Sequence, residues 1–216
     1  QRVRTRIATD LHDDIGSSLT QISVLSGVSR REVLENKEVS IAPLEKISIV
    51  SNELVESMSD IVWAINPRKD SLKELIFRMR RFASDILTVS EIEFEFDSPD
   101  PETEIRLDAN IRREVFVIFK ECLNNIVRHS GARNVEIVFQ VQESEILIKI
   151  TDDGKGFEME KVLSDGFSPE KGGNGLINMR RRAKDLGGVC EFESSATGTI
   201  IKLTIPFAPS VESVSH

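Results

Sequence analysis

The 216-residue sequence contains no tyrosine, one tryptophan and two cysteines. Cys122 and Cys190 lie far apart, with no Cys-x-x-Cys pair or Cys/His spacing that could build a zinc site or a disulfide framework. We therefore expect two buried thiols in a reducing compartment. Basic residues are also too few for sequence-independent binding to nucleic acid. The net charge is -8, and sequence-independent binding needs clustered Lys and Arg that outweigh the acids.

Long apolar runs are missing as well. No stretch approaches the roughly 20 residues that span a bilayer, and the opening QRVRTRIATD has no apolar segment of the signal-peptide kind. We expect a cytoplasmic domain. Any membrane anchor or sensor would lie upstream of residue 1.

The first 65 residues predict a hairpin of two long helices. Apolar residues recur every three or four positions over 2–35 and again over 44–65, with the polar turn ENKEVSIAP between them. Two helices cannot shield both apolar stripes alone, so we expect a homodimer whose two hairpins form a four-helix bundle. Asn66-Pro67 ends or kinks the second helix. Ser71 and Glu74 then form a capping box for a third helix, which extends the hairpin domain or leads out of it.

From residue 91 the pattern changes to alternating strands and helices. Strands are predicted at IEFEFD, VEIVFQV, EILIKITDDG, VCEFES and TIIKLTIPF, and helices over 108–130 and 174–187. The fold class is therefore α plus α/β. We divide the chain into a helical domain at 1–90, an α/β domain at 91–208 and a flexible tail at 209–216.

Two glycine-bearing segments of the second domain are suited to a nucleotide. In ITDDGKGF, Asp152 ends a strand, and the glycines after it let the backbone come close to a flat ligand, although a simple turn explains this segment too. In GGNGLINMRRRAKDLGG, glycines precede a helix whose N-terminal amides suit phosphate. That segment is not a Walker A loop, because no Gly-Lys-Ser/Thr follows, and it is not a dinucleotide fingerprint, because Asn178 stands where the third Gly belongs.

A third segment, KECLNNIVRHSG, is predicted to be helical. At about 100° per residue, a carboxylate, an amide and one or two cations gather on one flank, contributed by Glu121, Asn125, Arg128 and His129. That set could hold a divalent ion with its waters and contact phosphate, or it could be an ordinary polar helix edge.

In this order and spacing, the three segments resemble the ATP-binding domain shared by histidine kinases, gyrase, a heat-shock chaperone family and mismatch-repair ATPases. ECLNNIVRHSGA resembles the family's N-box, DDGKGF its first glycine box and GGNGL its second. The resemblance implies that Asp152 receives the adenine amino group, Asn125 holds Mg²⁺ and Glu121 positions a metal-bound water. The ATP-binding residues that it implies are Asn125, Arg128, His129, Asp152, Gly154, Gly156, Gly173, Gly175, Leu176 and Thr199.

RIATDLHDDIGSSLT, followed by a helix ending in MSDIVWAINP, resembles the dimerisation and phosphoacceptor hairpin of two-component sensor histidine kinases of the nitrate-sensor type. A neutral imidazole is a competent nucleophile at neutral pH once the proton on its other nitrogen is held. His12 is thus expected to attack the γ-phosphate of ATP, with Asp13 as its base or orienter.

The resemblance also implies a partner, the receiver domain of a response regulator, which would dock on the hairpin flank that includes Ser17, Ser18 and Gln21. Ser17 stands where relatives that also act as phosphatases carry glutamine, so we expect no strong phosphatase activity. Two other functions stay open. One is an ATP-dependent protein-serine kinase or ATPase of the same superfamily, and the other is a degenerate kinase that serves as an interaction module.

Overall fold

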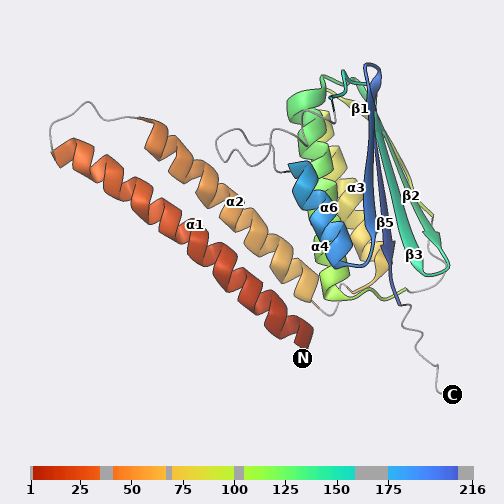
Figure 1. Ribbon diagram of the computed structural model, residues 1–216, viewed down its shortest axis with the longest axis horizontal. Helices are drawn as coiled ribbons and strands as arrows, with labels where there is room; N and C mark the ends of the chain where they lie inside the picture. The colour runs from red at the N-terminus through yellow and green to blue at the C-terminus, as the bar shows by residue number, and fades with distance from the viewer. Residues whose placement is uncertain (1, 35–40, 67–69, 100–104, 159–174, 209–216) are drawn as a thin grey trace. The chain divides into compact units, whose positions relative to one another are not determined.

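The computed structural model describes residues 2–34, 41–66, 70–99, 105–158 and 175–208, with the backbone alone for 2–14 and for positions 53 and 65 (Figure 1). The chain divides into two compact units, Gln1–Arg68 and Lys69–His216. Among the described residues, no helix is both long and apolar enough to cross a membrane.

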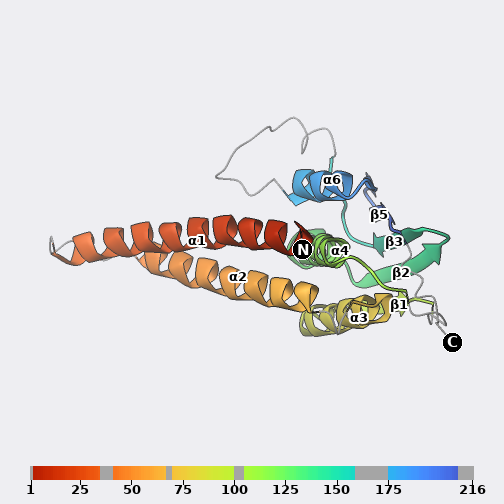
Figure 2. The ribbon, with the colours of Figure 1, turned by 90° about the horizontal axis from the view of Figure 1, so that it is seen from below.

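The first unit is a hairpin of two helices, α1 (Arg2–Leu34) and α2 (Ile41–Ile65), packed along each other (Figure 2). The predicted bounds of both helices are confirmed within a few residues, and α2 ends just before Asn66-Pro67. Among the side chains described in this unit, few are buried: Val50, Ile61 and Ala64 are at most 7% exposed, and the polar Ser29 and Asp60 are also buried. Much of the apolar surface of the two helices stays open to solvent.

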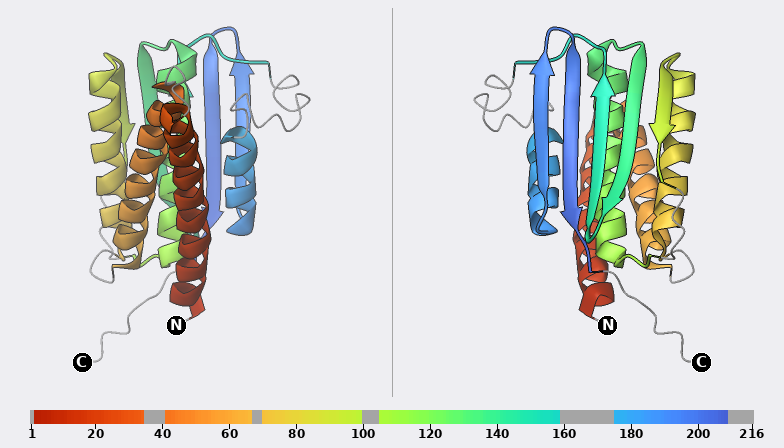
Figure 3. Two further views of the ribbon diagram at one scale, coloured as in Figure 1. Left: turned by 90° about the vertical axis from the view of Figure 1, so that its left-hand side faces the viewer. Right: turned by 90° about the vertical axis from the view of Figure 1, so that its right-hand side faces the viewer.

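The second unit is a five-stranded sheet covered on one face by α3 (Leu72–Val89), α4 (Ala109–Asn125) and α6 (Gly175–Asp185) (Figure 3). The sheet has the order β1-β2-β3-β5-β4. Its strands are β1 (Glu93–Asp97), β2 (Asn134–Gln142), β3 (Glu145–Asp152), β4 (Val189–Ser195) and β5 (Gly198–Pro206). β1 runs parallel to β2, and the other neighbours are antiparallel. The predicted α plus α/β class is confirmed.

Period-two alternation explains how the sheet meets its helices. Along β3, Ile146, Ile148 and Ile150 are at most 3% exposed, while the residues between them are half-buried or exposed. The inward side chains pack against the apolar faces of the helices, where Phe119 and Met79 are almost fully buried. The opposite face of the sheet carries more exposed residues, such as Lys149 on β3.

The third helix belongs to the second unit, whereas the sequence pattern places the domain boundary near residue 90. The start of α3 is tied to the segment before α4 by two backbone hydrogen bonds, Leu72 N to Ile105 O at 2.8 Å and Leu107 N to Asp70 O at 2.7 Å. The Phe82 ring meets that of Phe116 edge-on, with centroids 5.9 Å apart. The buried face of α3 therefore packs on α4 and the sheet.

The helix predicted over 108–130 is divided in two. The Asp108 carboxylate accepts a hydrogen bond from Asn110 N at 2.7 Å, which confirms the expected N-terminal cap. After Asn125 the coil widens into a π-helical turn, Ile126–Ser130, and Gly131 ends it with a left-handed φ of 66°.

Candidate functional site

A cavity of about 400 Å³ lies where the end of α4, the end of β3 and the start of α6 come together. It unites the three segments singled out in the sequence. From the helical segment it takes Asn125, Arg128 and His129. From the glycine-bearing segments and β5 it takes Asp152, Gly156, Gly175, Leu176 and Thr199.

Asp152 is a buried carboxylate of this cavity, with 4% of its surface exposed. Its Oδ1 accepts a hydrogen bond from Gly154 N at 2.9 Å, and the hydroxyl and backbone N–H of Thr199 also donate to the carboxylate. Burial raises the pKa of the Asp152 carboxyl above its ordinary value, and these hydrogen bonds oppose that rise. The cavity therefore presents an acceptor-only group at its floor, suited to the amino group of a flat base.

The two glycines after Asp152 are needed for close packing. A Cβ on Gly154 would lie 2.6 Å from Ser130 O, and one on Gly156 would meet Ser195 O and lie 2.8 Å from Ser194 Oγ. Gly156 also has a φ of +60°, which disfavours residues with a side chain. The first glycine segment can thus fold closely between the π-helical turn and the β4–β5 hairpin.

At the other end of the site, Asn125 Nδ2 lies 3.4 Å from Glu121 Oε1. Because the amide nitrogen faces the carboxylate, the Asn125 Oδ1 atom points away from it and is available as an oxygen ligand. Gly175 lies directly against this pair, since a Cβ there would meet Glu121 Oε1. Glu121 itself faces an adjoining cavity of about 220 Å³, which it shares with Asn178 and Arg182.

This donor set fits a magnesium ion held partly by substrate. Among the described residues no three His, Cys, Asp or Glu side chains gather as a metal site. Glu121 and Asn125 supply one carboxylate and one amide. Mg²⁺ commonly takes one or two protein oxygens and completes its shell with water and phosphate.

The π-helical turn carries Arg128 and His129, both exposed, to the rim of the cavity. A regular spacing of about 100° per residue places them on the flank of Glu121 but does not anticipate the wider turn. π-helical turns often occur at functional sites, and here the turn brings two cationic or titratable side chains to the same opening.

Several cavity residues were not among the predicted site residues. Lys155 and Phe157 line the cavity because they flank Gly156, and Ser130 joins it from the π-helical turn. Phe157 N donates a hydrogen bond to Ser194 Oγ at 2.8 Å. The positions of Lys155 and Phe157 next to a glycine box could have suggested a role, whereas the contact with Ser194 could not have been read from the sequence.

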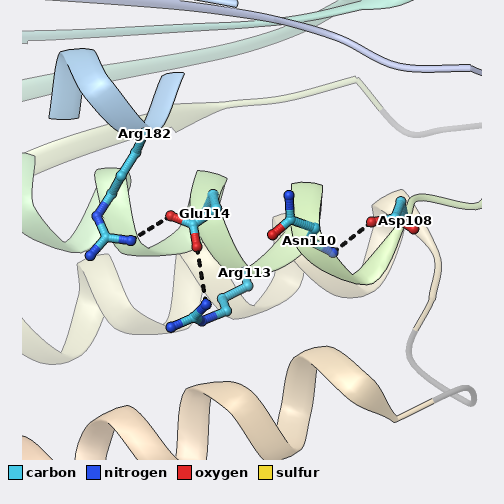
Figure 4. A network of polar contacts seen from close by, with 5 residues as sticks. All are labelled: Asp108, Asn110, Arg113, Glu114 and Arg182. Atoms are coloured by element: carbon cyan, nitrogen blue, oxygen red, sulfur yellow. Dashed lines mark hydrogen bonds and ion pairs between the residues drawn. The ribbon is translucent and has the colours of Figure 1, made fainter. Parts of the chain in front are cut away.

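A buried ion-pair network joins the two helices that frame the site (Figure 4). Arg182 of α6 lies 2.5 Å from Glu114 of α4, and Arg113 Nη1 lies 3.3 Å from the other oxygen of the same carboxylate. The network fixes α6, and with it Gly175 and Leu176 at its start, against α4.

Three predicted residues are placed only in part or not at all. His12 and Asp13 lie on α1 by backbone, and their side chains are outside the described residues. Gly173 is also outside the described residues. Gly154 is described and supports Asp152 rather than lining the cavity.

A helical hairpin with a His-Asp pair in its first helix, followed by a sheet-and-helix unit with this cavity, is the architecture expected of histidine kinases. A family model described as histidine kinase-, DNA gyrase B-, and HSP90-like ATPase matches residues 110–209. A second model, described as histidine kinase, matches residues 3–70. The chain belongs to the sensor histidine kinases of the nitrate-sensor-like subfamily.

Curated relatives agree with this assignment. Sensor histidine kinase LiaS of Bacillus subtilis is 27% identical over 95% of this chain and 54% of its own length. The histidine-protein kinase/phosphatase UhpB of Salmonella typhimurium is 29% identical over 95% of this chain and 39% of its own. The chain thus spans about half the length of such relatives or less.

Solved structures share the fold. The histidine kinase AdeS of Acinetobacter baumannii superposes with a TM-score of 0.57 at 21% identity, covering 87% of this chain and 95% of that one. The blue-light activated histidine kinase of Erythrobacter litoralis gives 0.59 at 16% identity, over 93% of this chain and 60% of that one.

Proposed function

We propose that this chain transfers the γ-phosphoryl group of ATP to His12 and then passes it to an aspartate of a response regulator. The observation that carries the proposal is the pairing of two features in one cavity. Asp152 offers a buried acceptor for a base at the floor, and Asn125 and Gly175 gather where a polyphosphate would end.

The nucleotide is oriented by the two ends of this cavity. The adenine amino group donates to Asp152, and Thr199 supports the base beside it. The phosphates then run toward Arg128 and the start of α6 at Gly175, where unpaired helix amides and the positive dipole end attract negative charge.

A magnesium ion, when bound, would offset the phosphate charge. Asn125 would hold it through Oδ1, and Glu121 would hold it through a water. Gly175 keeps the space over this pair free of a side chain. The residues of the chain thereby position the phosphates, which is the main requirement of phosphoryl transfer.

His12 is the nucleophile of the proposed reaction. One imidazole nitrogen forms a bond to the γ-phosphorus while the bond from that phosphorus to the β–γ bridging oxygen breaks and ADP leaves. Asp13 holds or accepts the proton on the other imidazole nitrogen, which keeps the attacking nitrogen neutral and nucleophilic. In the second step the phosphoryl group moves from His12 to the aspartate of the receiver domain.

Dimerisation through the hairpin is supported by its exposed apolar side chains. Leu19, Leu44, Val55, Met58 and Val62 are each 44–66% exposed, which is more apolar surface than a lone pair of helices usually leaves open. Pairing of two hairpins into a four-helix bundle would cover it. The regulator would dock on the flank that includes Ser17 and Gln21, which are both exposed. We place the chain in the bacterial cytoplasm, with any membrane anchor contributed by other segments.

The test is autophosphorylation with γ-labelled ATP and Mg²⁺, comparing the wild type with His12→Ala and with the matched control His216→Ala. Label that is lost in acid, kept in base and absent from His12→Ala alone supports the proposal. Acid-stable label, or label that survives in His12→Ala, favours the serine-kinase alternative. Free phosphate without protein label favours an ATPase, and no nucleotide binding favours an interaction module.

A further inference from the structure

Ser194 lies outside the nucleotide-binding cavity but touches two of its walls. Phe157 N donates to Ser194 Oγ at 2.8 Å, and Ser194 Oγ lies 3.4 Å from Thr199 Oγ1. Phe157 and Thr199 both line the cavity. One hydroxyl on β4 thus joins the segment after the first glycine box to the residue beside Asp152.

The direction of these hydrogen bonds follows from Asp152. An ionised carboxylate only accepts, so the Thr199 hydroxyl must donate its proton to Asp152. The Thr199 oxygen is then free to accept, and the proton between the two hydroxyls comes from Ser194. Ser194 in turn accepts from Phe157 N. Phe157 N, the Ser194 hydroxyl and the Thr199 hydroxyl therefore donate in series toward the carboxylate. In such a series each hydrogen bond strengthens the next.

One position on the Asp152 carboxylate remains for a ligand. A carboxylate has about four lone-pair sites, and Gly154 N, Thr199 N and the Thr199 hydroxyl take three of them. The fourth can accept one N–H from a base. If the Thr199 hydroxyl were free to turn, it could compete for that position or leave the carboxylate less well fixed.

We propose that Ser194 is a positioning residue for base selection: it locks the Thr199 hydroxyl onto Asp152 and holds Phe157 beside the base, which favours a purine that carries an exocyclic amino group at C6. The inference rests on the proposed nucleotide-binding function. Ser194 touches no nucleotide and acts through Thr199 and Phe157.

The neighbouring Ser195 supplies a matched control. Its hydroxyl lies on the same strand, is exposed, and pairs with Thr197 Oγ1 at 2.9 Å, away from the cavity. Ser195→Ala therefore removes one hydroxyl of the same hairpin without touching the chain of donors. Ser194→Thr keeps the hydroxyl and serves as the rescue variant.

The experiment measures dissociation constants of the 216-residue chain for ADP and for inosine diphosphate, which has an oxo group in place of the amino group. Ser194→Ala removes both part-buried hydrogen bonds of the Ser194 hydroxyl. It is expected to weaken ADP binding about five- to tenfold and to change inosine diphosphate binding less than about twofold. Ser195→Ala and Ser194→Thr should retain the wild-type ratio.

Equal loss of both ligands in Ser194→Ala would overturn the inference, because general damage to the cavity does not discriminate between bases. So would an unchanged ratio, or a Ser195→Ala variant that behaves like Ser194→Ala. If the wild type binds neither nucleotide, the proposed function fails and the inference falls with it. If the wild type binds ADP and Ser194→Ala does too with an unchanged ratio, the inference fails alone.

Discussion

Arg182 Nη1 lies 2.5 Å from Glu114 Oε2, and the Glu114 side chain is 10% exposed whereas that of Arg182 is 30% exposed. The pair therefore joins a buried carboxylate to a partly solvated cation, and Arg113 contacts the same carboxylate. The two ends of this contact should not be equally important to stability. Removing the buried carboxylate takes away the group that two guanidinium ions share.

We predict that Glu114→Ala lowers the free energy of unfolding by about 3–5 kcal/mol, the usual cost of removing one partner of a buried ion pair. Arg182→Ala should cost about 1 kcal/mol, since Glu114 keeps Arg113 and the lost group is partly solvated. Urea unfolding followed by circular dichroism measures both. Tryptophan fluorescence would not serve, because Trp63 belongs to the first unit.

The control for this prediction is the pair formed by Lys202 and Glu193, which has the same 2.5 Å distance but exposed side chains. Glu193→Ala should leave the unfolding midpoint unchanged within error. Similar losses in Glu114→Ala and Glu193→Ala would show that burial does not set the strength of these pairs.

Glycine-to-alanine substitution should lower activity at one position and raise stability at another. At Gly175 a Cβ would meet the Glu121 carboxylate, so Gly175→Ala should displace Glu121, the residue proposed to hold the magnesium ion through a water, and lower autophosphorylation by at least about 100-fold. At Gly27, inside α1, nothing lies within 4 Å of the added atom. Gly27→Ala should stabilise the helix by about 0.5–1 kcal/mol.

Phosphohistidine formation and thermal unfolding of the two variants check this contrast. Normal label in Gly175→Ala would mean that Glu121 can move aside at no cost. A lower melting temperature in Gly27→Ala would mean that the open face of α1 is covered closely by a second copy of the hairpin.

The local sequence patterns predicted most helices and strands. They did not predict the unit on which α3 packs, which depends on tertiary contacts. Period-two alternation identified β1 to β5, and the Ser71 cap is present, with Glu74 N donating to Ser71 Oγ at 3.3 Å. The capping box does not tell which unit the helix packs on, because an apolar face fits either core. The contact between Phe82 and Phe116 decides it.

The residues of the candidate site also include some that the sequence predicted and some that it did not. Asp152, Asn125 and Gly175 were predicted because short motifs fix their spacing along the chain, and the structure brings them to one cavity. Ser194 was not predicted, since its role depends on a strand and a loop 37 residues apart meeting through one hydroxyl. Nor does periodicity signal the π-helical turn, which adds its wider coil without changing the apolar pattern.

Asp153 predicts an acid-dependent loss of stability. Its carboxylate accepts hydrogen bonds from Asn134 Nδ2 at 2.8 Å, from Asn134 N at 2.9 Å and from Arg133 N at 2.7 Å. These bonds lower the pKa of Asp153 to about 2. A lowered carboxyl pKa stabilises the fold at pH values above the pKa of the unfolded chain, about 3.9, and that stabilisation is lost as the pH falls toward about 2.

Asp153→Asn should therefore be less stable than the wild type at neutral pH, and the difference should shrink as the pH is lowered from about 5 to about 2.5. Urea unfolding at each pH measures the difference. A gap between the two proteins that stays constant with pH would show that the carboxylate charge contributes nothing beyond the shape of the side chain.

The buried Asp152 carboxylate is expected to lower stability while it serves ligand binding. Burial raises the pKa of its carboxyl, so the ionised form costs stability, and that cost is fully present once the pH exceeds the raised value. Asp152→Asn removes that cost, and we expect a melting temperature equal to or above that of the wild type at neutral pH. Binding of ADP should become weaker. If the amide oxygen of the substituted side chain keeps the bond from Gly154 N, the amide nitrogen faces the cavity, where it opposes the adenine amino group.

We expect ADP binding to weaken at least about 100-fold in Asp152→Asn, measured by titration calorimetry beside thermal unfolding of the same samples. Asp153→Asn is the control, since its carboxylate points to Asn134 and not into the cavity. A variant at position 152 that melts earlier and binds weakly would indicate simple damage to the fold. Later melting together with lost binding is the signature of a buried charge kept for its ligand, at the expense of stability.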